Sequence, residues 1–217
     1  MQLVLPRLYV ILDAGLLTIP VNECAKDLAA SGVRLIQYRN KTAAARELLN
    51  TSRELSSLLK PLHVLFFVND RADVAALARA DGVHVGQEDL DVEQARSVIG
   101  EEKWVGVSTH NAEQFQRAAA TRADYIAVGP IFATGTKANA DPVMGVELIK
   151  QARAMTRKPI VAIGGITLER AREVIEAGAD SVAVGSDILR APHPRVRARQ
   201  YMDLLGPYGQ AVGTRRQ

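Results

Sequence analysis

The clearest chemistry in this sequence lies in three cations and two carboxylates that each follow a short apolar run: Arg39, Lys41, Lys137, Asp70 and Asp89. Magnesium takes one or two protein carboxylates and keeps several of its waters, so it can bridge a protein to a diphosphate. Lysine and arginine would neutralise the remaining charge of that diphosphate. The combination predicts a diphosphate site with Mg2+ as its cofactor, held by Asp70 and Asp89.

Both carboxylates also fit a purely structural role. Asp70 precedes the helical segment RADVAALARA, and Asp89 could begin the segment DLDVEQARS. Aspartate is a preferred residue at helix N-caps because its side chain accepts from free backbone amides. The sequence leaves both roles open.

Glycines near the C-terminus predict a second anion site. The runs IVAIG and SVAVG are followed by Gly165 and by Ser186, and Gly164 and Gly185 end the two runs. Glycine lets the backbone approach a ligand closely, and amides at helix N-termini favour negative charge. A phosphate monoester is therefore the expected ligand, and the alternative is that the glycines only form tight turns.

Two histidines are ambiguous. His84 lies within an apolar run, which favours a buried wall residue slightly over a substrate contact. His110 follows the fifth apolar run, where proton transfer and a surface role at the start of a helix are equally compatible.

The segment GPIFATGTK, residues 129–137, resembles a phosphate-binding loop with its residues out of order. A Walker loop has Gly, four residues, and then Gly-Lys-Ser/Thr. Here five residues separate Gly129 from Gly135, and Thr136 precedes Lys137. We interpret the segment as the loop after a sixth strand, in which Thr134, Thr136 and Lys137 reach over a substrate.

These residues must be positioned by alternating strands and helices. Amphipathic helical segments separate eight apolar runs, which we predict as strands over 8–13, 34–39, 64–69, 82–86, 104–108, 125–129, 160–164 and 181–185.

One phrase recurs on alternate predicted strands, as ADGVHVG, ADYIAVG and ADSVAVG at 80–86, 123–129 and 179–185. Repetition on every second strand, with strict alternation of strand and helix, favours a closed (β/α)8 TIM barrel, an α/β fold, over an open doubly wound sheet. The first strand also lacks the glycine fingerprint that dinucleotide-binding sheets carry. In such barrels the carboxyl ends of the strands hold the chemistry.

Composition places the chain among globular proteins. Its 217 residues fit one compact catalytic domain over 1–205, and 206–217 read as a disordered C-terminal tail. Cys24 is the single cysteine, which excludes an intrachain disulfide and favours a reducing, cytoplasmic setting. No apolar run approaches the roughly 20 residues that cross a bilayer, and we find no leader peptide, so we expect no membrane partner.

The net charge of +3 argues only weakly for nucleic acid, because part of it comes from arginines near the C-terminus. Aromatic residues are scarce and do not alternate with basic ones, so stacking platforms for single strands are absent. We expect small-molecule substrates and no nucleic acid.

Taken in order, several motifs resemble the thiamine phosphate synthase family: QYRNK (37–41), VNDRADVA (68–75), DGVHVGQEDL (81–90), GVSTH (106–110), GPIFATGTK (129–137), AIGGI (162–166) and AGADSVAVGS (177–186). The resemblance runs from about residue 8 to 190. It implies a transferase that couples 4-amino-2-methyl-5-hydroxymethylpyrimidine diphosphate to 4-methyl-5-hydroxyethylthiazole phosphate, giving thiamine phosphate and diphosphate.

The resemblance also implies roles for individual residues. The family's magnesium ligands match Asp70 and Asp89, and its pyrimidine contacts match Gln37 and His84. Its diphosphate contacts match Arg39, Lys41, Asn69, Ser108 and Lys137, of which we expect Arg39, Lys41, Ser108 and Lys137 to act in catalysis. The thiazole phosphate side matches Thr134, Thr136, Gly165, Gly185 and Ser186.

Two positions depart from the family pattern. Ala133 stands where proline is usual and Gly135 lies between the two threonines, which predicts a more mobile loop. Asp187 stands where a small apolar residue is common. A carboxylate so close to a phosphate site would have to point away from it.

Two alternatives are a thiazole tautomerase of the same fold, with His110 as its acid or base, and a non-catalytic binder of phosphate ligands. The retained charges at residues 39, 41, 70, 89 and 137 favour the synthase. A homo-oligomer is compatible with the sequence.

Overall fold

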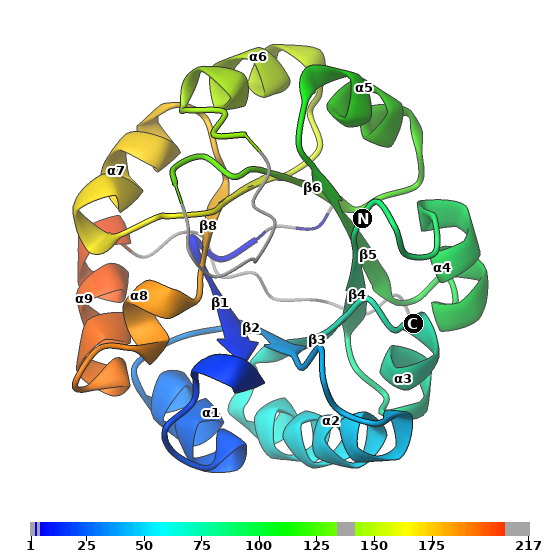
Figure 1. Ribbon diagram of the computed structural model, residues 1–217, viewed down its shortest axis with the longest axis vertical. Coiled ribbons are helices and arrows are strands. Elements are labelled where there is room, and N and C mark those ends of the chain that lie inside the picture. Colours follow the sequence, from blue (N-terminus) through cyan, green and yellow to red (C-terminus); the bar gives the residue numbers. More distant parts are fainter. Residues whose placement is uncertain (1–2, 4, 134–141, 207–217) are drawn as a thin grey trace.

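The protein is a closed barrel of eight parallel strands, and its computed structural model describes residues 3, 5–133 and 142–206. The strands are paired in chain order, and β8 closes the barrel against β1 (Figure 1). They are β1 (Leu8–Asp13), β2 (Leu35–Arg39), β3 (Leu65–Asn69), β4 (Gly82–Val85), β5 (Trp104–Thr109), β6 (Tyr125–Val128), β7 (Ile160–Ile163) and β8 (Ser181–Val184). The predicted TIM barrel is confirmed, and each predicted strand end lies within one residue of the observed one.

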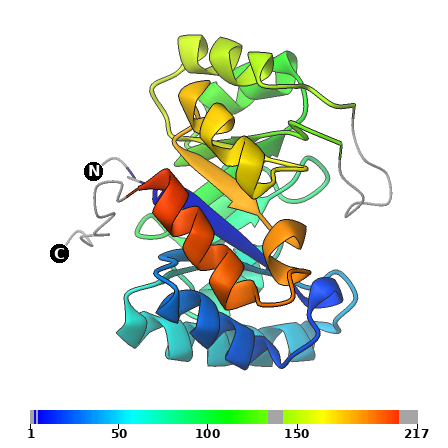
Figure 2. The ribbon, with the colours of Figure 1, turned by 90° about the vertical axis from the view of Figure 1, so that its left-hand side faces the viewer.

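Helices surround the barrel and cover the outer faces of its strands. They are α1 (Val21–Ala30), α2 (Ala45–Leu59), α3 (Ala72–Leu77), α4 (Val92–Ile99), α5 (Ala112–Ala120), α6 (Glu147–Met155), α7 (Leu168–Glu176), α8 (Ser186–Leu189) and α9 (Pro194–Leu205). Short 3-10 turns, η1 (Ala14–Leu16) and η2 (Lys60–Leu62), follow β1 and α2. Figure 2 shows α9 lying along the outside of the barrel beside β1.

Side chains alternate along each strand between the helical layer and the interior of the barrel. Val10 and Leu12 of β1 pack into the outer core with the helices, whereas Tyr9 and Ile11 belong to a separate interior cluster. Leu3 and Leu5 join this interior cluster from the segment before β1. The period of two, with both faces buried, is why the strands read as nearly continuous apolar runs.

Aromatic rings fill the interior, and glycines make room for them. A Cβ atom at Gly106 would lie 2.0 Å from Cζ of Tyr125, and one at Gly82 would lie 2.6 Å from the ring of Phe67. These two glycines are therefore required by the packing of neighbouring rings, and not by a turn.

The repeated Ala-Asp pair links each of β4, β6 and β8 to the strand before it. The backbone amide of Asp124 donates to the carbonyl of Val105, and its carboxylate accepts from the amide of the same residue, at 2.8 and 2.7 Å. Asp81 forms the same two hydrogen bonds with the backbone of Phe66, and Asp180 forms them with the backbone of Ile160. The repeat therefore marks the amino ends of the strands, the rim opposite the predicted site.

Two of these aspartates also hold an arginine. Asp124 forms an ion pair with Arg96 of α4, whose side chain is only 4% exposed, and Asp180 pairs with Arg153 of α6 at 2.8 Å. Arg96 also donates to backbone carbonyls of Arg122 and Lys103. The amino-end rim is thus tied together by charged groups whose partners all lie within the protein.

The described chain reaches Gly206, just after α9, so the predicted tail over 206–217 lies almost wholly outside the described residues. None of the helices in the described ranges is long and apolar enough to cross a membrane.

Candidate active site

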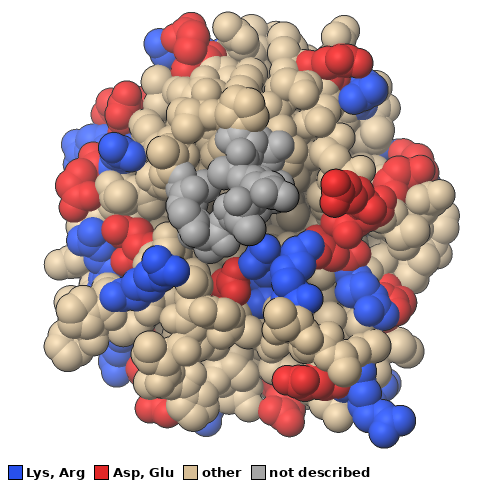
Figure 3. Space-filling model, viewed as in Figure 1, with Lys and Arg blue, Asp and Glu red and all other residues tan. Residues whose placement is uncertain are grey.

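The carboxyl ends of the strands form the rim that faces the viewer in Figure 3, where basic and acidic side chains gather near the middle. Arg39 ends β2, and its guanidinium forms an ion pair with Asp13, which ends β1. The two residues are partners in the strand register, so parallel pairing brings them together. Asp13 also accepts from the amide of Gly15 at 2.9 Å, which fixes its carboxylate.

Lys41 and Asp70 meet across the gap between the second and third strand ends. Their side chains form an ion pair, with Lys41 54% exposed and Asp70 18% exposed. Asp70 has a φ of 63°, in the left-handed region, and its amide donates to the carbonyl of His84 at 2.7 Å. Asparagine and aspartate tolerate this conformation better than most residues. The sharp turn after β3 thus brings the carboxylate of Asp70 to Lys41.

Asp89 lies beside Asp70. Its carboxylate accepts from the amide of Gly86 at 2.7 Å. Burial raises the pKa of Asp89, and a hydrogen bond with the carboxyl of Asp70 raises the pKa further. Two neighbouring carboxyl groups favour sharing a proton or a cation, since two like charges oppose ionisation of both.

Neither carboxylate serves as a helix cap. Helix α3 starts after Arg71, which makes no side-chain cap, and α4 is capped by Asp91 in a reciprocal capping box with Gln94. The structural alternative for Asp70 and Asp89 therefore fails, because other residues occupy the cap positions.

The chemistry of this donor set fits magnesium. Asp70 and Asp89 supply hard oxygen ligands and leave room for water and phosphate oxygens, as Mg2+ prefers. In the described ranges, no group of three or more His, Cys, Asp or Glu could hold a metal ion by itself. Within these ranges, a magnesium ion here would thus depend on oxygens beyond those of Asp70 and Asp89, such as those of water and phosphate.

His84 is buried in the wall of the barrel and still reaches the rim. Its Nε2 lies 2.8 Å from Oγ of Ser108, and its Nδ1 lies 2.8 Å from the hydroxyl of Tyr125. Burial lowers the pKa of His84 to about 4, so the ring is neutral near pH 7. The expectation of a wall residue is confirmed, and the same side chain borders the mouth of the barrel.

Gln37 and Asn69 complete this side of the site. Gln37 is buried in β2 and donates from Nε2 to the hydroxyl of Tyr9 at 2.7 Å. Asn69 ends β3, in register with His84 of β4. Five of the predicted residues, Gln37, Arg39, Asn69, His84 and Ser108, therefore stand at or just below one rim.

The glycines after β7 allow a close approach of the β6 loop. The amide of Phe132 donates to the carbonyl of Gly164 at 3.0 Å. Gly165 has a φ of 63°, and a Cβ there would lie 2.4 Å from the carbonyl oxygen of Ala133. Any larger residue at 165 would push this loop away from β7.

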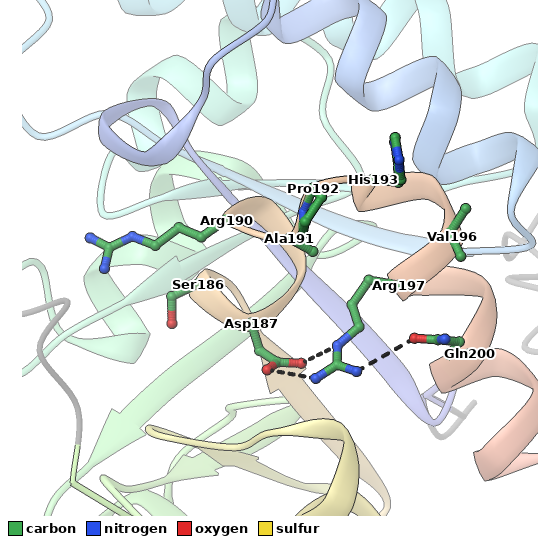
Figure 4. A pocket seen from close by; sticks show the side chains of 9 residues that line it. All are labelled: Ser186, Asp187, Arg190, Ala191, Pro192, His193, Val196, Arg197 and Gln200. Carbon is green, nitrogen blue, oxygen red and sulfur yellow. Dashed lines mark hydrogen bonds and ion pairs between the residues drawn. The ribbon is translucent and has the colours of Figure 1, made fainter.

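Gly185 ends the eighth strand run and Ser186 begins α8, next to a groove of about 450 Å³ between α8 and α9 (Figure 4). Asp187 points into this groove, where Arg197 donates to both of its oxygens at 2.9 and 3.1 Å. Tyr201 donates to the same carboxylate at 2.8 Å. Asp187 therefore faces α9, as the sequence required of a carboxylate so near a phosphate site.

Three predicted residues of the β6 loop, Thr134, Thr136 and Lys137, lie outside the described residues. The expected effect of Ala133 on that loop is likewise untested. His110 follows β5, and its Nδ1 lies 2.6 Å from the carbonyl oxygen of Gly129. A carbonyl only accepts, so Nδ1 carries a proton and the ring anchors the start of this loop.

The sequence places Asp13 at a strand end without giving it a role, and it gives no role to Tyr9 or Tyr125. Asp13 could have been found from strand register, because it and Arg39 end neighbouring parallel strands. The sequence indicates the two tyrosines less clearly. Each lies near the start of a strand, and alternation along the strand predicts only that its side chain faces either inward or outward.

Comparison with known proteins agrees with this arrangement. The family model described as thiamine monophosphate synthase matches residues 8–188. The thiamine-phosphate synthase of Koribacter versatilis is 52% identical over 206 residues, covering 93% of this chain and 96% of the relative. The relative of the same name from Methanospirillum hungatei is 41% identical and covers 84% of this chain and 89% of its own.

A solved structure, the thiamine phosphate pyrophosphorylase from Pyrococcus furiosus, is 34% identical with a TM-score of 0.83. The match covers 92% of this chain and 95% of that one. On these matches, which span nearly the whole barrel, the chain belongs to the thiamine monophosphate synthase family.

Proposed function

We propose that this protein is a transferase that condenses 4-amino-2-methyl-5-hydroxymethylpyrimidine diphosphate with 4-methyl-5-hydroxyethylthiazole phosphate, giving thiamine phosphate and diphosphate. Membership of the family supports the reaction. The observation in this chain that best supports the proposal is that one rim of the barrel holds four charged residues: Arg39, Lys41, Asp70 and Asp89. A diphosphate needs such charges, and a tautomerase of the thiazole phosphate does not.

Arg39, Lys41, Asn69 and Ser108 are proposed to bind the diphosphate. Arg39 and Lys41 pair with Asp13 and Asp70 in this structure, and both ion pairs lie at the open end of the barrel. A multiply charged diphosphate would compete for these donors, because arginine matches phosphate oxygens with two parallel hydrogen bonds. Lys137 of the β6 loop is assigned the same role from the sequence.

Asp70 and Asp89 are proposed to hold Mg2+. When bound, the ion would neutralise charge that develops on the leaving diphosphate. The neighbouring positions of the two carboxyls support this assignment. Burial and the proximity of Asp70 both raise the pKa of Asp89, and a bound cation would offset both effects.

Gln37 and His84 are proposed to face the pyrimidine. Departure of diphosphate leaves positive charge on the pyrimidine methylene carbon, which the aminopyrimidine ring stabilises. A neutral His84 adds no repulsion to that charge, and the buried interior beneath it excludes water that would trap the cation. The thiazole nitrogen then captures the carbon, a step that requires no general base.

The thiazole phosphate is proposed to lie over the ends of β7 and β8. Gly165, Gly185 and Ser186 are assigned to this ligand from the sequence, since glycine lets a backbone approach a phosphate closely. Thr134 and Thr136 are assigned to the same ligand from the sequence. Asp187 does not oppose this, because its charge is neutralised by Arg197.

The test is to incubate the purified protein with both substrates and Mg2+ and to measure thiamine phosphate. Product formation that stops when the metal is chelated supports the proposal. Isomerisation of the thiazole phosphate precursor without thiamine phosphate would instead identify a tautomerase.

A matched pair of lysine variants sharpens this test. Lys41→Ala should lower kcat/KM for the pyrimidine diphosphate about 100-fold, because a positioned charge is lost. Lys60→Ala removes an exposed lysine from η2, at the opposite end of α2, and should stay within about twofold of wild type. Equal losses in both variants would remove Lys41 from the site.

A further inference from the structure

A row of polar side chains crosses the interior of the barrel below the proposed site. Gln37 Nε2 lies 2.7 Å from the hydroxyl of Tyr9, which lies 3.0 Å from the hydroxyl of Tyr125. That hydroxyl contacts Nδ1 of His84, and Nε2 of His84 contacts Ser108, both at 2.8 Å. The row therefore runs unbroken from β2 through β1, β6 and β4 to the end of β5.

The direction of this row follows from its first member. An amide nitrogen only donates, so the Tyr9 oxygen accepts from Gln37. The single proton of Tyr9 then needs an acceptor, and its remaining hydrogen-bond partner in the described ranges is the oxygen of Tyr125. The proton of Tyr125 in turn points to Nδ1 of His84, which leaves the ring proton on Nε2 as the donor to Ser108.

We propose that Tyr9 and Tyr125 are positioning residues that hold His84 as its Nε2-H tautomer and so turn the hydroxyl proton of Ser108 outward to the substrates. The opposite direction would leave the proton of Tyr9 buried without an acceptor, and an unsatisfied buried donor destabilises the folded protein. In that opposite direction the hydroxyl of Ser108 would donate its proton to His84, so only a lone pair of Ser108 would face the mouth of the barrel.

Protonation and packing keep the row in one state. Burial raises the pKa of both Tyr9 and Tyr125, so their hydroxyls keep their protons, and His84 is neutral near pH 7. The ring of Tyr125 stacks on His84 with centroids 5.5 Å apart, and lies over Gly106, which has no Cβ to displace it. Phe67 and Tyr9 pack against the same ring at 5.9 and 6.1 Å.

The consequence for chemistry rests on the proposed function. Ser108 stands at the carboxyl end of β5, where the diphosphate is proposed to leave. A hydroxyl that already accepts from His84 donates its own proton to an anionic oxygen, and such a charge-assisted hydrogen bond strengthens as charge develops. The tyrosines thus act through His84 and Ser108 and need not contact substrate.

Nitrogen NMR of the histidine side chains in the substrate-free protein tests the tautomer. The His84 signals are identified by their loss in His84→Asn. The wild-type protein should carry the proton on Nε2 and a hydrogen bond at Nδ1, and a proton on Nδ1 would overturn the proposal. This measurement needs no turnover, so its result is independent of the proposed reaction.

Tyr125→Phe removes the donor to Nδ1 and should shift His84 toward a mixture of tautomers. Tyr38→Phe is the matched control, because Tyr38 is a buried strand tyrosine whose hydroxyl contacts Asn40 and not the row. The control should leave the His84 signals unchanged. An unchanged tautomer in Tyr125→Phe, or an equal shift in the control, would contradict the assignment.

Kinetics test whether the row acts through Ser108. Tyr125→Phe should lower kcat about tenfold, the loss of roughly one hydrogen bond, and change each KM by less than about twofold. In a Ser108→Ala background the same substitution should have no further effect. Losses that multiply in the double variant would show that Tyr125 does not act through Ser108.

Discussion

The two rims of the barrel use aspartate in opposite ways. At the amino-end rim, Asp124 is hydrogen-bonded to both the backbone amide and the carbonyl of Val105, and it forms an ion pair with the buried guanidinium of Arg96. At the carboxyl-end rim, Asp89 faces a second carboxyl, and its pKa is raised. The charge of Asp124 is balanced by a residue of the protein itself, whereas the charge of Asp89 is balanced best by a bound cation.

This difference separates stability from function. A charged group that is paired within the folded protein raises the free energy of unfolding. A carboxylate held beside a second carboxylate lowers it. Functional sites commonly carry such a cost. The comparison therefore predicts that equivalent substitutions at the two rims change stability with opposite signs.

The largest effect is expected for Asp124→Ala. It leaves a nearly buried arginine without its carboxylate, so the free energy of unfolding should fall by about 3 kcal/mol. Asp81 makes the same backbone contacts without an ion pair among the described residues, so Asp81→Ala should cost about 1 kcal/mol. Urea unfolding measures both, and equal losses would show that the ion pair with Arg96 adds nothing.

Magnesium should have the next largest effect. At a Mg2+ concentration about ten times its dissociation constant, the free energy of unfolding of the wild-type protein should rise by about 1.4 kcal/mol. Asp89→Asn keeps an acceptor for the amide of Gly86 and loses the charge, so this variant should show no rise. A rise of the same size in the variant would place the metal elsewhere.

The smallest effect is a dependence on pH without metal. Because the folded pKa of Asp89 is raised, the folded state binds the proton more tightly, and stability falls as pH rises above the usual carboxyl value of about 4. Asp89→Asn should therefore be more stable than wild type at pH 7. Solvent screening limits the gain to less than about 1 kcal/mol. The difference should vanish near pH 4, and a variant less stable than wild type at pH 7 would reverse the comparison.

Most of the fold could be predicted because the barrel strands are short apolar runs, separated by helices and marked by a repeated phrase. The Ala-Asp repeat indicates alternate strands of the barrel, but the pattern does not indicate what the aspartates do. That role depends on a reciprocal contact between Asp124 and Val105, residues 19 positions apart, which no local pattern reveals.

The candidate site could be predicted in part. Strand ends placed Arg39, Asp70 and Ser108 on one rim, and this is where they lie. The pairing of Arg39 with Asp13 needed the strand register, and the hydrogen-bonded row through Tyr9 and Tyr125 needed the direction of each side chain in the interior. Composition and periodicity do not contain either kind of information.

The most direct test of the account is the rate of thiamine phosphate formation by Asp89→Asn and Asp124→Ala, measured with saturating substrates where both variants are folded. Asp124→Ala should keep the wild-type kcat, while Asp89→Asn should lose about 100-fold because charge on the leaving diphosphate is no longer neutralised. A wild-type kcat in Asp89→Asn would contradict the assignment of chemistry to this rim.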